Sequence, residues 1–176
     1  MFKITKTHKV MLITLGITIV IVGYGFFRTI TSISTYTKGI GVNLPKDSTI
    51  IMDGDSHGGF HGDGEYYSEI QLTDDGIKKF SNNANKTGEW FPTPLPKDIE
   101  IILHGGEYEG INYNIGNKSK NIPKDIKNGI YYVRDRFAES NSNMKNKNIL
   151  SRNSFNVTVS ILDFETKKLY VYKLDT

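Results

Sequence analysis

One glycine-rich stretch concentrates the side chains that could carry chemistry. "DGDSHGGFHGDGEYYSE", residues 53 to 69, holds five glycines, two histidines and five acidic residues, with no lysine or arginine. Imidazole and carboxylate groups placed close together suit zinc, manganese or iron. Glycines beside such groups let the backbone come close to an ion or a substrate. This stretch is therefore the first candidate site.

The candidate metal ligands come from this stretch and from one later segment. "LHGGEYEG", which begins at Leu103, repeats the His-Gly-Gly trio of residues 57 to 59 after a similar Pro-Lys-Asp phrase. Two strands that end in His-Gly-Gly and lie side by side would bring three imidazoles together. The candidate first ligands are His57, His61 and Asp63, for zinc or manganese. The candidate completions of the ligand shell are His104, Asp55, Glu65 and Glu107.

A plainer interpretation of the same stretch needs no metal. Strand-like runs flank it, and its glycines supply the positive φ angles of a hairpin loop, with Asp63-Gly64 as a turn pair. The histidines then hydrogen-bond within the loop and shape it. Known motifs do not decide between the two interpretations, because the sequence contains no HExxH and no GxxxxGK[ST]. An EF-hand is disfavoured as well, since its twelfth position falls on Gly64 instead of an acid.

The N-terminal part of the chain carries an apolar segment, "VMLITLGITIVIVGYGFF". These 18 residues, Val10 to Phe27, contain no charge. As a helix rising about 1.5 Å per residue they would reach about 27 Å, close to the hydrocarbon thickness of a bilayer. Three lysines lie in the nine residues before the segment, whereas Arg28 and Lys38 are the nearest basic residues after it. This asymmetry predicts that the N-terminus lies on the cytoplasmic side of the cell membrane and the C-terminal domain on the outer side.

A cleaved secretory signal is the alternative for this segment. Ser32-Ile33-Ser34 offers a small-x-small cleavage site, but the apolar core is long for a signal peptide, which favours an uncleaved anchor. The predicted layout is a cytoplasmic basic N-terminus (residues 1–9), a transmembrane helix (10–27), a tether (28–43) and an extracytoplasmic domain (44–176). The predicted partners are the lipid bilayer through residues 10–27 and an envelope protein or small ligand.

The charge balance gives no argument for a nucleic-acid partner. Four of the 22 basic residues precede residue 29, which leaves 18 against all 19 acids, or 18 − 19 = −1, for the remainder. Charge is uneven within that remainder. Residues 47 to 75 hold eight acids and no lysine or arginine, whereas residues 118 to 152 hold nine basic residues and three acids. Ion pairs between the two segments are expected, with Arg134-Asp135-Arg136 among them.

The expected fold class is α+β, with one mostly antiparallel sheet and one or two short helices. The phrases that begin at Leu44, Leu95 and Ile122 each place Pro-Lys-Asp before a β-branched run, and each predicts a turn that leads into a strand. Residues 65–72 alternate as a strand does. "TDDGIKKF" predicts a helix with Thr73 as its N-cap, ending by Gly88.

The C-terminal segment predicts a β-hairpin. Residues 155–161 alternate apolar and polar, residues 163–166 form the turn, and residues 169–174 return. Because both faces of the returning strand carry apolar or aromatic residues, this strand is expected to be central or covered. Trp90 is expected to cover the core beneath the proline-containing connector that follows it.

The order of these motifs resembles a group of small uncharacterised proteins of Gram-positive bacteria. The resemblance covers most of residues 43 to 176, and its most specific part is "HGGFHGDGE", residues 57 to 65. Proteins of that group are typically secreted, lipidated or singly membrane-anchored, so the resemblance implies a setting at the bacterial cell envelope. It implies no activity.

Three functions fit these patterns. The first is a membrane-anchored extracytoplasmic module that binds a partner or ligand, and the lack of any complete catalytic constellation favours it. The second is a metal-dependent, hydrolase-like enzyme that uses the histidine and carboxylate loop. The third is a structural or immunity-like protein in which the loop only serves folding. The chain has no cysteine, which excludes disulfides, thiolate metal sites and a cysteine nucleophile.

Overall fold

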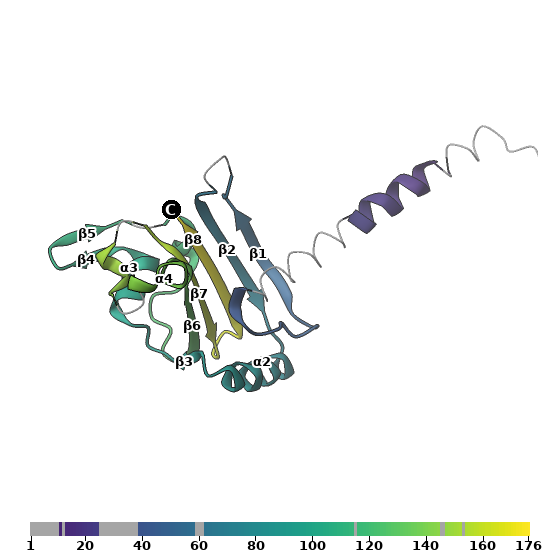
Figure 1. Ribbon diagram of the computed structural model, residues 1–176. Coiled ribbons are helices and arrows are strands. Elements are labelled where there is room, and N and C mark those ends of the chain that lie inside the picture. The colour runs from purple at the N-terminus through teal and green to yellow at the C-terminus, as the bar shows by residue number, and fades with distance from the viewer. Residues whose placement is uncertain are drawn as a thin grey trace, which may run out of the picture. The chain divides into compact units, whose positions relative to one another are not determined.

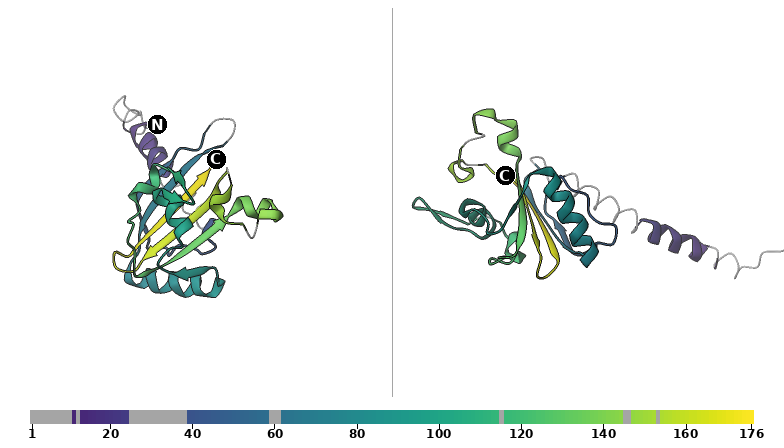
Figure 2. Two further views of the ribbon diagram at one scale, coloured as in Figure 1. Left: turned by 90° about the vertical axis from the view of Figure 1, so that its left-hand side faces the viewer. Right: turned by 90° about the horizontal axis from the view of Figure 1, so that it is seen from below.

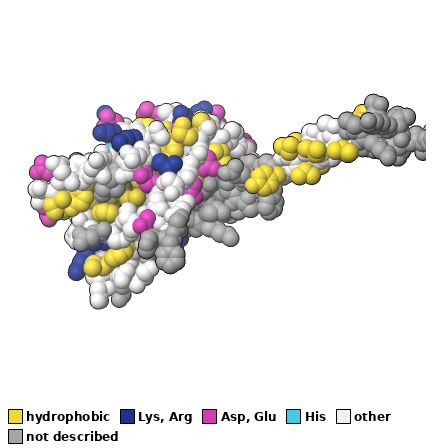
Figure 3. All heavy atoms as spheres, turned by 90° about the horizontal axis from the view of Figure 1, so that it is seen from above, with side chains coloured by type: hydrophobic (Ala, Val, Ile, Leu, Met, Phe, Trp, Pro, Cys, Tyr) yellow, Lys and Arg dark blue, Asp and Glu magenta, His cyan; other side chains and the backbone are white. Residues whose placement is uncertain are grey.

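The computed structural model describes residues 11, 13–24, 39–58, 62–114, 116–144, 147–152 and 154–176. The chain consists of two units, Met1–Tyr36 and Thr37–Thr176. In the first unit, residues 13–24 are helical and their large apolar side chains are exposed, by 56% at Leu15 and 68% at Tyr24 (Figure 3). Among the described residues, no helix is both long and apolar enough to span a bilayer. Both ends of the predicted transmembrane segment, residues 10–27, lie outside the described residues.

The second unit is built on one antiparallel sheet of six strands, in the order β1-β2-β8-β7-β6-β3 (Figure 1). The strands of this sheet are β1 (Thr49–Asp55), β2 (Gly64–Gln71), β3 (Trp90–Pro92), β6 (Gly129–Asp135), β7 (Asn156–Asp163) and β8 (Lys168–Asp175). A separate two-stranded hairpin pairs β4 (Gly106–Tyr108) with β5 (Ile111–Tyr113). The predicted α+β class and antiparallel sheet are confirmed. The C-terminal hairpin forms the centre of the sheet, as predicted.

Three α-helices lie wholly within the described part of this unit, compared with the one or two expected. They are α2 (Asp74–Thr87), α3 (Lys97–His104) and α4 (Arg136–Ser140), with short 3-10 turns η1 (Lys118–Asn121), η2 (Ser142–Met144) and η3 (Ile149–Ser151). The predicted boundaries of α2 are confirmed. The Thr73 hydroxyl accepts the Gly76 N–H, and Gly88, with φ 69°, ends the helix in the left-handed conformation.

The prediction of a strand after the second Pro-Lys-Asp phrase is wrong. The first and third phrases do lead into β1 and β6, but the second begins α3, with Pro96 at the N-cap. Proline fits a helix start, and Asp98 and Glu100 in the first turn complement the helix dipole. Four apolar residues in the remainder of α3 are buried, so tertiary packing decides in favour of the helix over the strand tendency of isoleucine.

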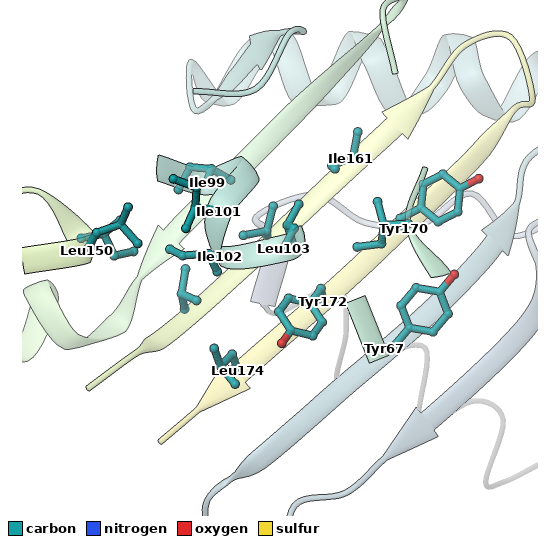
Figure 4. Close-up of a cluster of buried hydrophobic side chains, with 14 residues drawn as sticks. Tyr67, Ile99, Ile101, Ile102, Leu103, Leu150, Ile161, Tyr170, Tyr172 and Leu174 are labelled. Carbon is teal, nitrogen blue, oxygen red and sulfur yellow. The ribbon is translucent and has the colours of Figure 1, made fainter. Parts of the chain in front are cut away.

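The two faces of the sheet are covered by different helices, α3 on one side and α2 on the other (Figure 2). On the α3 side, a buried cluster joins Ile101 and Leu103 to Tyr172 and Leu174 of β8 (Figure 4). On the α2 side, Phe80 meets the Trp90 ring edge-on at 5.1 Å. Trp90 also stacks on Tyr132 at 5.5 Å and is 7% exposed, so the predicted role of Trp90 in the core is confirmed.

The domain also takes in part of the predicted tether. Ile40 and Val42 are 0% and 3% exposed, respectively, and belong to the core of the second unit. Burying two β-branched apolar side chains stabilises the domain by about 1.5–3 kcal/mol each. The segment that precedes β1 is therefore a structural part of the domain.

Candidate functional site

His57 lies between two carboxylates at one end of the sheet. Its backbone N–H donates to Asp55 Oδ1 over 2.8 Å, and its ring Nδ1 lies 2.5 Å from the same oxygen. The other ring nitrogen, Nε2, lies 3.0 Å from Oδ2 of Asp175. Each ring nitrogen of His57 therefore faces a carboxylate oxygen.

Basic side chains compensate the charge of Asp175. Arg136 Nη2 lies 2.5 Å from Asp175 Oδ1, and Lys173 Nζ lies 2.6 Å from Oδ2. Burial alone would raise the pKa of Asp175, but the hydrogen bonds from Lys173 and Arg136 outweigh burial and hold the pKa below its usual value. We refer to Asp55, His57, Asp175 and Arg136 together as the His57 clamp.

Asp55 is ionised for a related reason. Burial alone would raise its pKa, but the backbone N–H and the ring of His57 outweigh burial, so the pKa of Asp55 is below its usual value. The side chain of Asp55 is 59% exposed, whereas that of His57 is 16% exposed. The clamp is therefore exposed to solvent at Asp55 and largely buried at Asp175.

The hairpin of β1 and β2 brings the clamp together. Gly64 pairs with Asp175 in the register of β2 and β8, which places the start of β2 next to the end of β8. A Cβ atom added to Gly64 would lie 2.6 Å from both N and Cα of His57, so only glycine allows the two backbones to approach this closely. The Ser56 N–H donates to the Glu65 carbonyl over 2.9 Å and closes the hairpin beside the clamp.

An open groove with a cavity volume of about 500 Å³ adjoins the clamp. Its lining includes the carboxylates of Asp63, Glu65 and Asp175, the amide of Asn114, and the apolar side chains of Phe155 and Leu174. Within the described part of the chain, no lysine or arginine side chain lines this groove. The groove therefore offers mainly hydrogen-bond acceptors and a small apolar surface.

Glu65 is fixed in the wall of the groove. Its Oε2 accepts the backbone N–H groups of Asn117 and Lys118 at 2.9 and 2.8 Å. The Tyr172 hydroxyl donates to the same oxygen over 3.2 Å. Burial, with the nearby Glu65 carboxylate adding to it, raises the pKa of Tyr172, so this hydroxyl remains a donor. Three donors on one carboxylate hold the η1 loop against β2.

The structure brings together some of the predicted ligands and separates others. Asp55 and His57 are in contact, and Asp63 and Glu65 lie in the adjoining groove. His61 lies outside the described residues. Glu107 belongs to β4, where it pairs with Asn112 in the separate hairpin.

The expectation that two strands ending in His-Gly-Gly lie side by side is wrong. His104 is the last residue of α3, not the end of a strand. Burial lowers the pKa of His104, and the charged groups that act on it are Lys124, Glu100 and Asp125, none of which belongs to the His57 clamp. In the described residues, no group of three or more histidine, aspartate or glutamate side chains is arranged to hold a metal ion.

Sequence reasoning missed the C-terminal half of the clamp. Asp175 stands 118 positions from His57, and no local motif marks it. The expected partners of Arg134-Asp135-Arg136 are also wrong, because the ion pairs that these three residues form are with other parts of the chain and none is with a described residue between 47 and 75. Arg134 binds Glu139 at 2.8 Å, Asp135 binds Arg152 at 2.6 Å, and Arg136 binds Asp175. The sequence did predict the C-terminal hairpin. The central position of this hairpin in the sheet places Asp175 at the edge of the groove.

No protein-family model, curated protein or solved structure matches this chain.

Proposed function

We propose that this chain is a single-pass, membrane-anchored extracytoplasmic binding module whose ligand occupies the groove between the start of β2 and the end of β8. The observation that carries the proposal is the arrangement at His57. Its two ring nitrogens each face a carboxylate, and the groove next to it is open. The histidine and carboxylate groups then serve to hold the walls of a binding groove.

The membrane anchor is supported by the character of the N-terminal helix. Along residues 13–24 no side chain is charged, and the large side chains are apolar and more than half exposed, for example 63% at Ile13 and 66% at Val22. A helix that is apolar all round needs an apolar surrounding, which a bilayer supplies. The lysines before the segment favour an N-terminus inside and a domain outside.

The groove fits a ligand that carries N–H donors or a positive charge. Asp63 is the lining carboxylate that no other described residue hydrogen-bonds or pairs with, so its oxygens are the acceptors that such a ligand would meet. Phe155 and Leu174 offer apolar contact to an adjoining methylene chain. A lysine side chain in an extended peptide has both features.

The alternative, a zinc- or manganese-dependent enzyme, is less well supported. A metal bound by His57 would have to displace Asp55 or Asp175 from a ring nitrogen. Arg136 and Lys173 already compensate the charge of Asp175, and they would repel a cation placed there. Among the described residues, no three histidine, aspartate or glutamate side chains are grouped as the ligands of a catalytic zinc site would be.

The anchor is tested by flotation of the full chain with neutral lipid vesicles, followed by carbonate washing. The expected result is a chain that stays with the vesicles, and in cells a C-terminal reporter fusion that is active only outside the membrane. Release by carbonate, or a reporter active only inside, would overturn the anchor or its orientation.

The groove is tested by NMR of the full chain in lipid nanodiscs. Adding the tripeptide Ala-Lys-Ala is expected to shift the amide signals of Gly64 and Gly116, and Ala-Glu-Ala is the control. An Asp63→Asn variant should weaken the lysine peptide at least threefold. Equal shifts with both peptides, or shifts only at a distance from the groove, would overturn the ligand class.

A further inference from the structure

Strand β1 exposes two apolar side chains, and one of them, Met52, lies beside a basic loop. Ile51 and Met52 are 51% and 47% exposed, although both belong to a strand. Met52 Sδ lies 3.9 Å from Nδ2 of Asn121 in η1. Lys118 Nζ lies 3.1 Å from the place where a Cβ atom on Gly54 would stand. The loop that carries η1 therefore runs alongside the exposed part of β1.

This loop is strongly basic. Residues 117–128 contain four lysines and a single acid, Asp125, which gives 4 − 1 = +3. The lysines of this loop are Lys118, Lys120, Lys124 and Lys127. None of the four ammonium groups forms an ion pair with another described residue, and Lys120 only donates to Asn117, over 3.1 Å. The nearest groove acid, Glu65, is turned to the backbone N–H groups of the loop.

We propose that the basic loop of residues 117–128, together with the exposed apolar side chains of β1, docks onto the anionic surface of a lipid bilayer. The proposal rests on the proposed function, since the N-terminal helix places the domain at that bilayer. Only residues 25–36 separate the described helix from the second unit, and these 12 residues can span about 42 Å at most. The domain therefore remains within reach of the lipid headgroups.

The chemistry of the surface fits headgroups and the layer beneath them. Lysines on a loop pair with lipid phosphates without needing one fixed geometry, and clusters of four or more recognise anionic lipids. Exposed apolar side chains at the same place can enter the boundary between headgroups and acyl chains. An acidic protein surface would complement the charge of the lysines, but it would fit the exposed apolar side chains of Ile51 and Met52 less well than a bilayer does.

Docking is tested on the full chain in two kinds of vesicle, one of neutral phosphatidylcholine and one with about a third phosphatidylglycerol. Hydrogen exchange is measured for residues 117–128 and for β1. In the anionic vesicles, exchange in both segments is expected to slow at least threefold relative to the neutral vesicles. Half-molar sodium chloride should remove the difference, because the attraction is screened.

The control variants separate charge at this surface from charge in general. Replacing all four loop lysines with glutamine should abolish the slowing. Replacing four exposed lysines elsewhere, Lys46, Lys78, Lys79 and Lys86, should leave it unchanged. A second variant, Ile51→Ser with Met52→Ser, should reduce the slowing while leaving the charge intact. Exchange of β7 and β8 reports whether each variant is folded.

Failure of docking can be told apart from failure of the anchor. A chain that floats with neither vesicle would overturn the anchor. A chain that floats with both, but exchanges equally in both, would overturn docking alone. Slowing that persists in half-molar salt, or slowing caused only by an added acidic protein, would overturn an anionic lipid surface as the partner.

Discussion

His57 Nε2 lies 3.0 Å from Asp175 Oδ2, and this contact joins two residues that are 118 positions apart in the chain. It fastens the segment after β1 to the end of the central strand β8. Arg136, at the start of α4, holds the other oxygen of the same carboxylate. Three distant parts of the chain therefore meet at one side chain, and the groove lies beside them.

Replacing His57 with glutamine should destabilise the domain. Glutamine cannot contact both carboxylates as the ring does, so the Asp175 side chain, which is 19% exposed, loses one of its hydrogen-bonding partners. The expected loss in free energy of unfolding is about 1–2 kcal/mol, measured by urea denaturation of the full chain. Lys86→Gln is the control and should change the free energy by less than about 0.5 kcal/mol. Equal behaviour of the two variants would show that the clamp contributes nothing to stability.

Stability should fall as the solution becomes acidic, through the two carboxylates of the clamp. The pKa values of Asp55 and Asp175 are lowered in the folded protein. The unfolded value is near 3.9, so their contribution is complete above about pH 5 and is lost as pH falls through the lower, folded values. Urea midpoints at several pH values from 7 to 3 measure this. Asp175→Asn should flatten the profile, and an unchanged slope would contradict the assignment.

Two glycines with the same backbone conformation should respond differently to alanine. Gly116 and Gly88 have φ of 71° and 69°, so both substitutions carry a similar backbone cost of about 1 kcal/mol. A Cβ atom on Gly116 would collide with the Tyr172 hydroxyl and lie 2.8 Å from Ser119 Oγ, whereas one on Gly88 meets nothing within 4 Å. Gly116→Ala should therefore cost about 1–3 kcal/mol more than Gly88→Ala in thermal or urea unfolding. Equal losses would mean that the η1 loop is not held tightly against Tyr172.

The N-cap of α2 should account for a measurable part of the stability. The Thr73 hydroxyl accepts the Gly76 N–H over 2.9 Å and donates to Asp47 in the turn before β1. Thr73→Ala removes both hydrogen bonds and should lower the free energy of unfolding by about 1 kcal/mol. Thr73→Ser keeps the hydroxyl and should restore most of that loss. If serine is no better than alanine, the hydroxyl does not cap the helix.

The fold was largely predictable where local signals and tertiary packing agree. Thr73 and Gly88 mark the two ends of α2 through capping chemistry alone, and the alternation in the C-terminal hairpin matches β7 and β8. The prediction failed at α3, because Ile99, Ile101 and Ile102 suit a strand locally but are buried as a helix against the sheet. Composition alone does not distinguish these outcomes.

The site was predictable only in its local half. Asp55 and His57 are two residues apart, so their contact follows from a tight turn after a strand. Asp175 and Arg136 reach His57 through the order of strands in the sheet, which no residue near His57 specifies. The His-Gly-Gly trio that His104 shares with His57 suggests a common structure, but a local motif does not specify the tertiary position of either residue. Helix α3 places His104 among different charged groups.

The central claim is that His57 makes structural contacts with Asp55 and Asp175 and does not bind a metal ion. Elemental analysis of the full chain tests this claim most directly. The protein should be purified in detergent without a chelating tag, with His57→Gln and His61→Gln variants prepared in parallel. The result expected is no zinc or manganese near one equivalent in any of the three proteins. Near-stoichiometric metal in the native chain that disappears in both variants would contradict the claim and restore the metal-dependent enzyme.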